Sequence, residues 1–268
     1  MLHSNRGAVS QGYFMKRLVL AVSLLGISAA SALAADLPMK APVAAPAVYD
    51  WSGIYFGGFG GWASSRDCWV VNQTALVGVI QPGINEGCGN ATGGVAGGSF
   101  GYRFQSGNLV AGMDAMGGWA GLSGSNTSLA AGLIGAAVTN QSKMDAFGLY
   151  TGHFGLAWNN SLFYVKTGLA VTDNKYQGQF TGTGVAFDQA NETRVGYAIG
   201  LGYEYGFTPN WSVGVEYNHF FMFNSANNLN LIGTNTLSRV DTIQQDVDMV
   251  LLKVNYHFGL GGPVVAKY

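Results

Sequence analysis

Residues 194–205, RVGYAIGLGYEY, alternate between two kinds of side chain along their whole length. Every second residue is large and apolar or aromatic, and those between are mostly glycine and alanine, with a charged residue near each end. A strict two-residue period predicts a β-strand that lies between two unlike environments. The small face suits the narrow interior of a barrel, and the large face suits lipid.

Seven further segments show the same alternation, three of them clearly and four more weakly. The clear segments are 162–171, 211–218 and 250–258, and the weaker ones are 53–63, 94–104, 109–119 and 145–158. A strand of about ten residues tilted by about 40° rises roughly 25 Å, which matches the apolar band of an outer-membrane barrel. The pattern therefore predicts about eight strands, or ten if segment 74–81 or 129–138 also pairs.

The connections between these segments alternate in length. Short ones at 105–108, 159–161 and 206–210 are rich in turn-forming residues, and long ones fall at 64–93, 120–143, 173–191 and 223–245. Short periplasmic turns that alternate with long extracellular loops are typical of outer-membrane barrels. The predicted fold is all-β: an eight-stranded antiparallel up-and-down transmembrane β-barrel.

The composition supports a surface that does not face water. Charged residues make up 10% of the 268 residues, against about 25% in ordinary soluble domains, and 41 residues are glycine. The formal net charge of -1 gives no electrostatic footprint for nucleic acid. High apolar content excludes disorder, and the glycines lack the three-residue period of collagen.

The N-terminal region carries the marks of export. A basic start at Met15 precedes an apolar run over 18–27 and a small-residue cleavage pattern that ends at Ala34. We predict a signal peptide over 1–34, with Met15 as its true start, a proline- and alanine-rich periplasmic linker over 35–50, and a barrel over 51–268. After Ala35 the sequence has no run of 18 apolar residues, so the barrel strands are expected to cross the membrane.

The polar faces of the predicted strands carry charges of both signs, which we expect to form a network inside the barrel. Its predicted members are Arg103, Asp114, Lys166, Arg194, Glu204, Glu216, Asp248 and Lys253. An eight-stranded barrel is just wide enough for side chains to fill it. The network is therefore either a packed, nearly closed polar core, which we favour, or the lining of a narrow ion path.

Cysteine, histidine and tryptophan positions give three more predictions. Cys68 and Cys88 both lie in the first long connection and are expected to form a disulfide after export. The histidines at 153, 219 and 257 lack metal-ligand spacing, so neither a metal nor another cofactor is expected. Five tryptophans near strand ends are expected to form aromatic girdles at the membrane interfaces: Trp51, Trp62, Trp119, Trp158 and Trp211.

Three stretches give the chain a family resemblance. ALAADLPMKAP (32–42), YDWSGIYFGGFGGWA (49–63) and NYHFGLGGPVVAKY (255–268) resemble the Omp25/Omp31-type outer-membrane proteins of alphaproteobacteria, especially Rhizobiales. The resemblance implies an abundant, porin-like surface protein. Some members of this family are described as haem-binding or as immunodominant antigens, but no residue motif here carries haem binding across.

These observations predict a structural or porin-like component of the Gram-negative envelope. The alternative is a surface binding protein or adhesin that acts through its extracellular loops, with haem as one candidate ligand. An enzyme is not expected, because Glu216 and His219 should lie on opposite strand faces. The expected partners are outer-membrane lipid and, during insertion, the barrel-assembly machinery, for which Phe258 and Tyr268 would form a C-terminal aromatic signal. No nucleic acid partner is expected, and the oligomeric state stays open.

Overall fold

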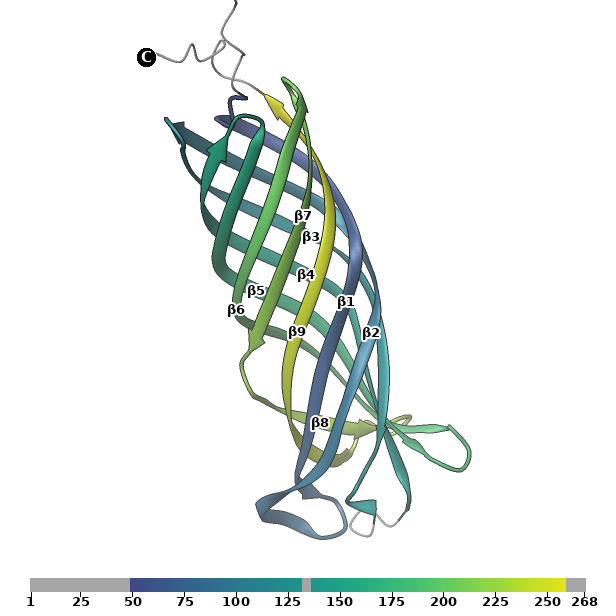
Figure 1. The fold of residues 1–268 in the computed structure, drawn as a ribbon. Coiled ribbons are helices and arrows are strands. Elements are labelled where there is room, and N and C mark those ends of the chain that lie inside the picture. Colours follow the sequence, from purple (N-terminus) through teal and green to yellow (C-terminus); the bar gives the residue numbers. More distant parts are fainter. Residues whose placement is uncertain (1–48, 132–135, 259–268) are drawn as a thin grey trace, which may run out of the picture. The chain divides into compact units, whose positions relative to one another are not determined.

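The computed structural model describes residues 49–131 and 136–258 (Figure 1). The predicted signal peptide, the linker up to residue 48 and the C-terminal residues from 259, with Tyr268, lie outside the described residues. Nine strands occur in the described part of the chain. They are β1 (Gly53–Thr74), β2 (Gly78–Ser106), β3 (Leu109–Thr127), β4 (Val138–Trp158), β5 (Ser161–Phe180), β6 (Ala186–Thr208), β7 (Trp211–Met222), β8 (Ser225–Leu231) and β9 (Leu237–Phe258).

Eight of these strands form a closed antiparallel ring. Each strand from β1 to β6 pairs with the next, β7 pairs with β9, and β9 pairs with β1 to close the barrel. The short strand β8 is not one of the eight ring strands. It pairs with the extended part of β9 and meets β6 only at Asp188 and Gln189. No helix in residues 49–131 and 136–258 is long and apolar enough to cross a bilayer.

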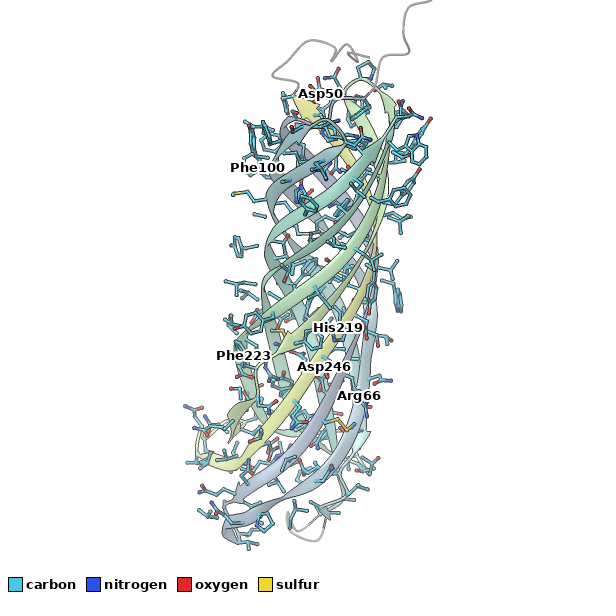
Figure 2. All side chains as sticks on the ribbon, turned by 60° about the vertical axis from the view of Figure 1, so that its left-hand side comes forward. Asp50, Arg66, Phe100, His219, Phe223 and Asp246 are labelled. Atoms are coloured by element: carbon cyan, nitrogen blue, oxygen red, sulfur yellow. A yellow bond between two sulfur atoms is a disulfide. The ribbon has the colours of Figure 1, made fainter. Side chains whose placement is uncertain are left out.

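The predicted outward face is confirmed as a belt of exposed apolar side chains. All eight predicted segments lie within ring strands, and the large side chains on one face of each segment point away from the lumen. Figure 2 shows Phe100 on this belt near the end at which Asp50 lies, whereas Arg66, His219 and Asp246 lie toward the other end. Representative belt residues are Phe56, Phe100, Tyr150, Phe163, Leu201, Val213 and Leu252.

Two-residue turns join the strands at the end where the described chain begins and ends. They are Gly107–Asn108, Asn159–Asn160 and Pro209–Asn210, as predicted. Gly107 and Asn159 have φ values of 61° and 52°, the left-handed region that tight hairpin turns require. By the usual layout of such barrels this is the periplasmic end.

The long connections are built differently from the prediction. The ladders continue far beyond the apolar belt, so 64–74 and 78–93 are strand rather than loop, and the β1–β2 tip is only Ala75–Val77. Segment 74–81 adds no further strand to the ring, since 78–81 is the start of β2 itself, and residues 132–135 of segment 129–138 lie outside the described residues. The sequence hides these extensions because, outside lipid, both strand faces are polar and the two-residue contrast disappears.

The predicted disulfide is confirmed in the β1–β2 extension. Cys68 and Cys88 lie directly opposite each other in the ladder and are bonded. The bond therefore links the two strands of this hairpin beyond the apolar belt.

Inward-facing glycines make room for aromatic rings from the adjacent strand. Gly101 lies opposite Tyr55, and Gly202 lies opposite Tyr164. A Cβ atom at either glycine would collide with the ring of its tyrosine partner. These pairs let large rings lie flat against the barrel wall and fill the lumen.

Candidate functional site: the barrel lumen

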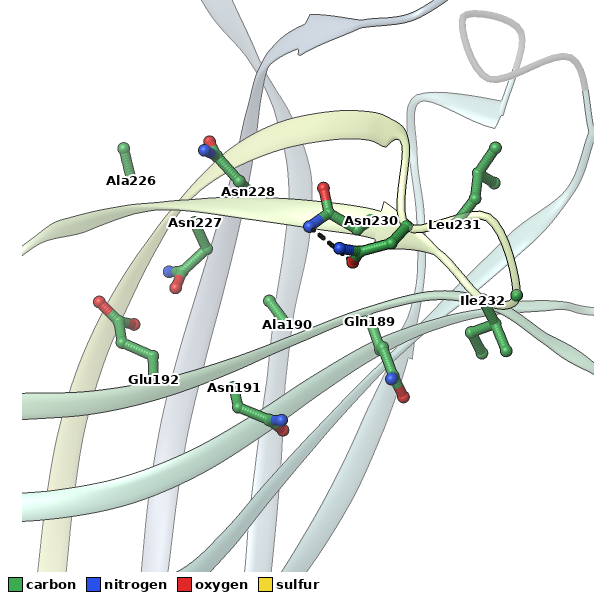
Figure 3. A pocket seen from close by; sticks show the side chains of 12 residues that line it. Gln189, Ala190, Asn191, Glu192, Ala226, Asn227, Asn228, Asn230, Leu231 and Ile232 are labelled. Carbon is green, nitrogen blue, oxygen red and sulfur yellow. Dashed lines mark hydrogen bonds between the residues drawn. The ribbon is translucent and has the colours of Figure 1, made fainter.

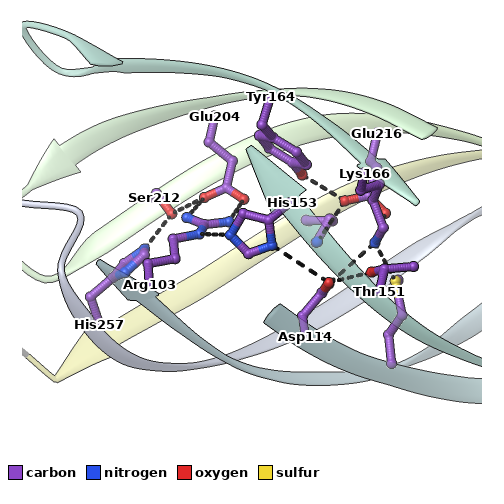
Figure 4. A network of polar contacts seen from close by, with 12 residues as sticks. Arg103, Asp114, Thr151, His153, Tyr164, Lys166, Glu204, Ser212, Glu216 and His257 are labelled. Carbon is purple, nitrogen blue, oxygen red and sulfur yellow. Dashed lines mark hydrogen bonds and ion pairs between the residues drawn. The ribbon is translucent and has the colours of Figure 1, made fainter. Parts of the chain in front are cut away.

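The lumen holds an ion-pair network near the periplasmic end (Figure 4). The Arg103 guanidinium donates two hydrogen bonds to Glu204, at 2.9 Å from Nη1 and 2.6 Å from Nη2. Both side chains are at most 1% exposed. Arg103 Nε also donates to His153 Nε2 at 3.2 Å, and the Ser212 hydroxyl donates to Glu204 at 3.1 Å. Strands β2, β4, β6 and β7 are therefore connected across the interior.

A second group of charges lies beside the first. Lys166 Nζ lies 3.2 Å from Asp114 and 3.0 Å from Glu216, and Lys253 Nζ lies 2.8 Å from Glu216. The Tyr164 hydroxyl donates to Glu216 at 2.6 Å, and the Thr151 hydroxyl donates to Asp114. Together with Arg103 and Glu204, three cations face three carboxylates, so this part of the lumen is electrically neutral.

Aromatic side chains close the periplasmic mouth. The guanidinium carbon of Arg103 lies 4.3 Å from the ring centre of Tyr55 and 5.6 Å from that of Trp51. Tyr49 packs on Trp51 with ring centres 4.4 Å apart, and His257 contacts both rings. Such stacking satisfies the charge of Arg103 on the face that Glu204 does not cover.

Trp51 corrects one prediction. It is fully buried inside the mouth, whereas the other four predicted girdle tryptophans are exposed on the outer surface. Trp69, which the sequence did not single out, is also fully buried in the lumen. The lumen therefore accommodates two indole rings.

On the loop side of the ion pairs, the middle of the lumen is apolar. Phe59, Phe147 and Phe220 come from β1, β4 and β7, which lie far apart around the ring, yet their rings meet. The centre of the Phe147 ring lies 5.8 Å from that of Phe59 and 6.4 Å from that of Phe220. Further buried side chains fill the same layer, including Met116, Met144, Leu149, Val247, Met249 and Leu251. The two-residue alternation does not predict this layer, because it assigns the large apolar residues to the lipid face.

A second charged cluster fills the loop end of the lumen. Arg239 lies 3.1 Å from Glu86, 3.0 Å from Asp188 and 3.2 Å from Asp241, and all four side chains are at most 1% exposed. Asn140 also accepts a hydrogen bond from Arg239 at 2.9 Å. The members of this cluster lie in segments predicted to be loops, so no strand pattern in the sequence predicted it.

Two buried carboxyl groups at the loop end have perturbed pKa values. Burial raises the pKa of Asp67 to about 6, although Ser65 donates a hydrogen bond to it and Arg194 is nearby. Burial also raises the pKa of Asp241 well above its ordinary value, and the neighbouring carboxylates of Glu86 and Asp188 add to the effect, although Arg239 opposes it. Both groups favour the protonated form more than an exposed carboxyl would.

The structure places seven of the eight predicted network residues inside the barrel. Six form the ion-pair network near the periplasmic end: Arg103, Asp114, Lys166, Glu204, Glu216 and Lys253. Arg194 is buried but separate, nearer the loop end, where it donates hydrogen bonds to the Tyr176 hydroxyl and to the carbonyls of Phe223 and Ile243.

Asp248 is the exception. Its side chain is 54% exposed on the outer surface and accepts hydrogen bonds from the Tyr217 hydroxyl, at 2.5 Å, and from His219 Nδ1, at 2.7 Å. Its position follows from strand geometry, because it lies two residues from Val250 and so shares the outward face. The exposed Phe221 and Phe223 follow His219 toward the loop end, so Asp248 lies at the edge of the apolar belt, where Tyr217 and His219 satisfy its carboxylate. His153 and His257, in contrast, are buried in the lumen.

Comparison with known proteins assigns the family. A family model described as an outer membrane protein beta-barrel domain matches residues 20–258. The chain belongs to this outer-membrane β-barrel family. It is 27% identical to the 25 kDa outer-membrane immunogenic protein of Brucella abortus over 238 residues, which cover 87% of this chain and 95% of the relative.

Another relative is the 31 kDa outer-membrane immunogenic protein of Brucella melitensis, with 28% identity over 261 residues, 91% of this chain and 96% of the relative. The resemblance to the Omp25/Omp31-type proteins is thus confirmed, and this β-barrel is located in the outer membrane.

Two solved structures align with most of this chain at low sequence identity. OprG of Pseudomonas aeruginosa aligns with a TM-score of 0.49 and 13% identity over 77% of this chain and 98% of its own. Ail, the attachment invasion locus protein of Yersinia pestis, aligns with a TM-score of 0.38 and 14% identity over 77% of this chain and 99% of its own.

Proposed function

We propose that this β-barrel is a structural component of the outer membrane whose lumen does not conduct ions. The observation that supports the proposal is the contact of Phe59, Phe147 and Phe220 across the interior. Their rings leave an apolar layer between two charged clusters, and an ion would have to lose its hydration shell to cross it. Of the two predicted interiors, this layer favours the packed core over the ion path.

The ion pairs on the periplasmic side of this layer also favour a closed lumen. Each charged side chain of the periplasmic network is bonded to groups on other strands, so an aqueous path would have to break paired charges. Removing one partner of a buried ion pair costs on the order of 3–5 kcal/mol. The network therefore acts as a set of cross-links that stiffens the barrel.

Conductance in a planar lipid bilayer tests the proposal. Refolded wild-type protein, confirmed as folded by its heat-dependent mobility in gel electrophoresis, is expected to show no discrete channels. A variant with Phe59→Ala, Phe147→Ala and Phe220→Ala is expected to conduct, because water can then enter the middle layer. Stable channels formed by the folded wild type would overturn the proposal.

Surface binding through the loop end is the second candidate function. The observation in its favour is that the β1–β2 hairpin extends well beyond the apolar belt and is cross-linked at Cys68 and Cys88. A rigid projection offers a binding partner a surface with little conformational entropy to lose. Loss of cell-surface binding on exchange of residues 69–87 for a short turn, with the barrel still inserted, would support this function.

We further propose that the protein is not an enzyme and that the barrel-assembly machinery inserts it. In support of the first point, Glu216 faces the lumen and His219 the outer surface, so they form no acid–base pair. Phe258, which ends β9 on the lipid face, supports the second.

A further inference from the structure

The barrel wall has a gap between β6 and β8 at the loop end. Strand β7 ends at Met222, and its pairing with β6 stops at Gly196. Strand β8 meets β6 again only at Asp188 and Gln189. Between these two contacts, among the described residues, β6 has a ladder partner on its β5 side alone.

The unpaired edge of β6 presents free backbone groups. The carbonyl of Phe187 accepts a hydrogen bond from the N–H group of Ile232, just after β8. The carbonyl of Val195 accepts one from the N–H group of Phe223, just after β7. Because alternate residues of a strand direct their backbone groups to the same side, Asn191 and Thr193 point theirs into the gap. The register that pairs Gln189 with Asn230 would bring Asn228 opposite Asn191, but the strands have diverged there.

A cavity of about 590 Å³ occupies this gap (Figure 3). Its lining is rich in side-chain amides and contains one carboxylate, that of Glu192. Figure 3 shows Glu192 of β6 and Asn227 of β8 projecting toward each other across it. The cavity lies beyond the apolar belt, since Val195 is exposed and apolar whereas Asn191 and Thr193 are exposed and polar.

Glu192 has one long ion pair and no hydrogen bond among the described residues. Its Oε2 atom lies 3.7 Å from Arg194 Nε and accepts no hydrogen bond. The Nη atoms of Arg194 are engaged elsewhere, by the Tyr176 hydroxyl and by two backbone carbonyls. Arg194 does not line the cavity, so a cationic side chain that entered it would meet the carboxylate of Glu192 as the one charged group of the lining.

We propose that this gap is a binding site for an extended peptide segment, which adds to the Ala190–Val195 edge of β6 as an extra strand. Unpaired strand edges bind extended chains through backbone hydrogen bonds, and pockets for alternate side chains supply the selectivity. Here the inward side chain of the peptide beside Glu192 is lysine or arginine. The site depends on the wall of the barrel, not on whether its lumen conducts.

Amide hydrogen exchange and peptide binding test this site on the full barrel in detergent micelles. In the free protein, the amides of Asn191 and Thr193 are expected to exchange much faster than that of Arg194, which lies in the β5 ladder opposite Thr172. Addition of the fluorescein-labelled peptide TVTKTVT is expected to slow both amides and to raise fluorescence anisotropy.

Matched variants separate backbone pairing from side-chain contact. Thr193→Pro removes one donor at the edge and is expected to weaken binding about tenfold, whereas Thr193→Ala keeps the donor and should bind like wild type. Methylation of alternate backbone nitrogens of the peptide gives the same test without altering the protein. Glu192→Gln is expected to weaken TVTKTVT but not TVTQTVT.

Three results would overturn the proposal. One is protection of the Asn191 and Thr193 amides in the free protein, and another is equal binding of the methylated and unmethylated peptides. The third is protection of these amides by a neutral oligosaccharide such as maltotriose but not by the peptide, which would assign the cavity to glycans instead.

Discussion

Arg103 and Glu204 form a two-pronged ion pair across the interior of the barrel, between β2 and β6, which are not neighbours in the ring. Both side chains are removed from water, so each depends on the other for compensation. Tyr55, which stacks on the guanidinium, and Ser212, which donates to the carboxylate, complete their surroundings.

Breaking this pair from one side is expected to destabilise the barrel more than removing it whole. Arg103→Met leaves the Glu204 carboxylate buried and unpaired, at a cost on the order of 3–5 kcal/mol in the free energy of unfolding. Arg103→Met combined with Glu204→Leu should recover a large part of this loss. Urea unfolding in lipid vesicles, followed by tryptophan fluorescence, measures the difference, and a double variant no more stable than the single one would contradict the expectation.

Filling the space beside Tyr164 is expected to disturb the network from a distance. Gly202→Val places a branched side chain where the Tyr164 ring lies, which should displace the ring and its hydrogen bond to Glu216. Overpacking of this kind costs about 1–3 kcal/mol. Gly98→Ala is the control, because a Cβ atom there meets only an ordinary contact at 3.6 Å. Thermal unfolding midpoints compare the two, and equal midpoints would show that the lumen relaxes around the new side chain.

Removal of the disulfide is expected to loosen the β1–β2 extension while the barrel stays inserted. Cys68 and Cys88 are 20 residues apart, and closing a loop of that size stabilises by roughly 3 kcal/mol in the chain-entropy model. Replacement of both cysteines by serine should expose residues 69–87 to protease digestion in intact cells. Reducing agent should make the wild-type hairpin equally sensitive, and a hairpin that stays resistant in both cases would assign its rigidity to the strand ladder alone.

Asp67 is expected to make the barrel more stable as the pH falls. Its folded pKa of about 6 lies above the unfolded value of about 3.9, so its ionised form opposes folding. Stability should therefore rise as the pH drops from about 7 to about 4, by on the order of 2–3 kcal/mol from this group. Asp67→Asn should flatten that part of the pH dependence, and Asp173→Asn, which removes an exposed carboxylate, is the control. Parallel curves for wild type and Asp67→Asn would refute the assignment.

The sequence predicted the membrane-facing surface well and the interior less well. Alternation located all eight ring strands, because a lipid face demands an apolar residue at every second position. It placed Asp248 on the wrong face and Trp51 on the wrong surface, because charge and aromaticity alone do not report which way a residue points.

The rest of the interior depended on contacts between distant strands. Phe59, Phe147 and Phe220 are each inconspicuous in sequence and become a layer only when the ring brings their strands together. The Arg239 cluster was hidden in the same way, since polar ladders beyond the lipid give no periodic signal. Strand β8 and the gap beside it follow from where β7 ends, which no local pattern in the sequence marks.

The ladder between β1 and β9 pairs Ile54 with Phe258, residues 204 positions apart in the chain. Every other ring ladder joins strands closer in sequence, so this seam is the one that needs both ends of the chain at once. A partly exported chain can form hairpins, but it keeps two open edges that lipid does not tolerate until its last strand arrives. Insertion into the membrane therefore requires β9 to be present. A chain truncated before β9 cannot close the ring, so it is not expected to insert stably.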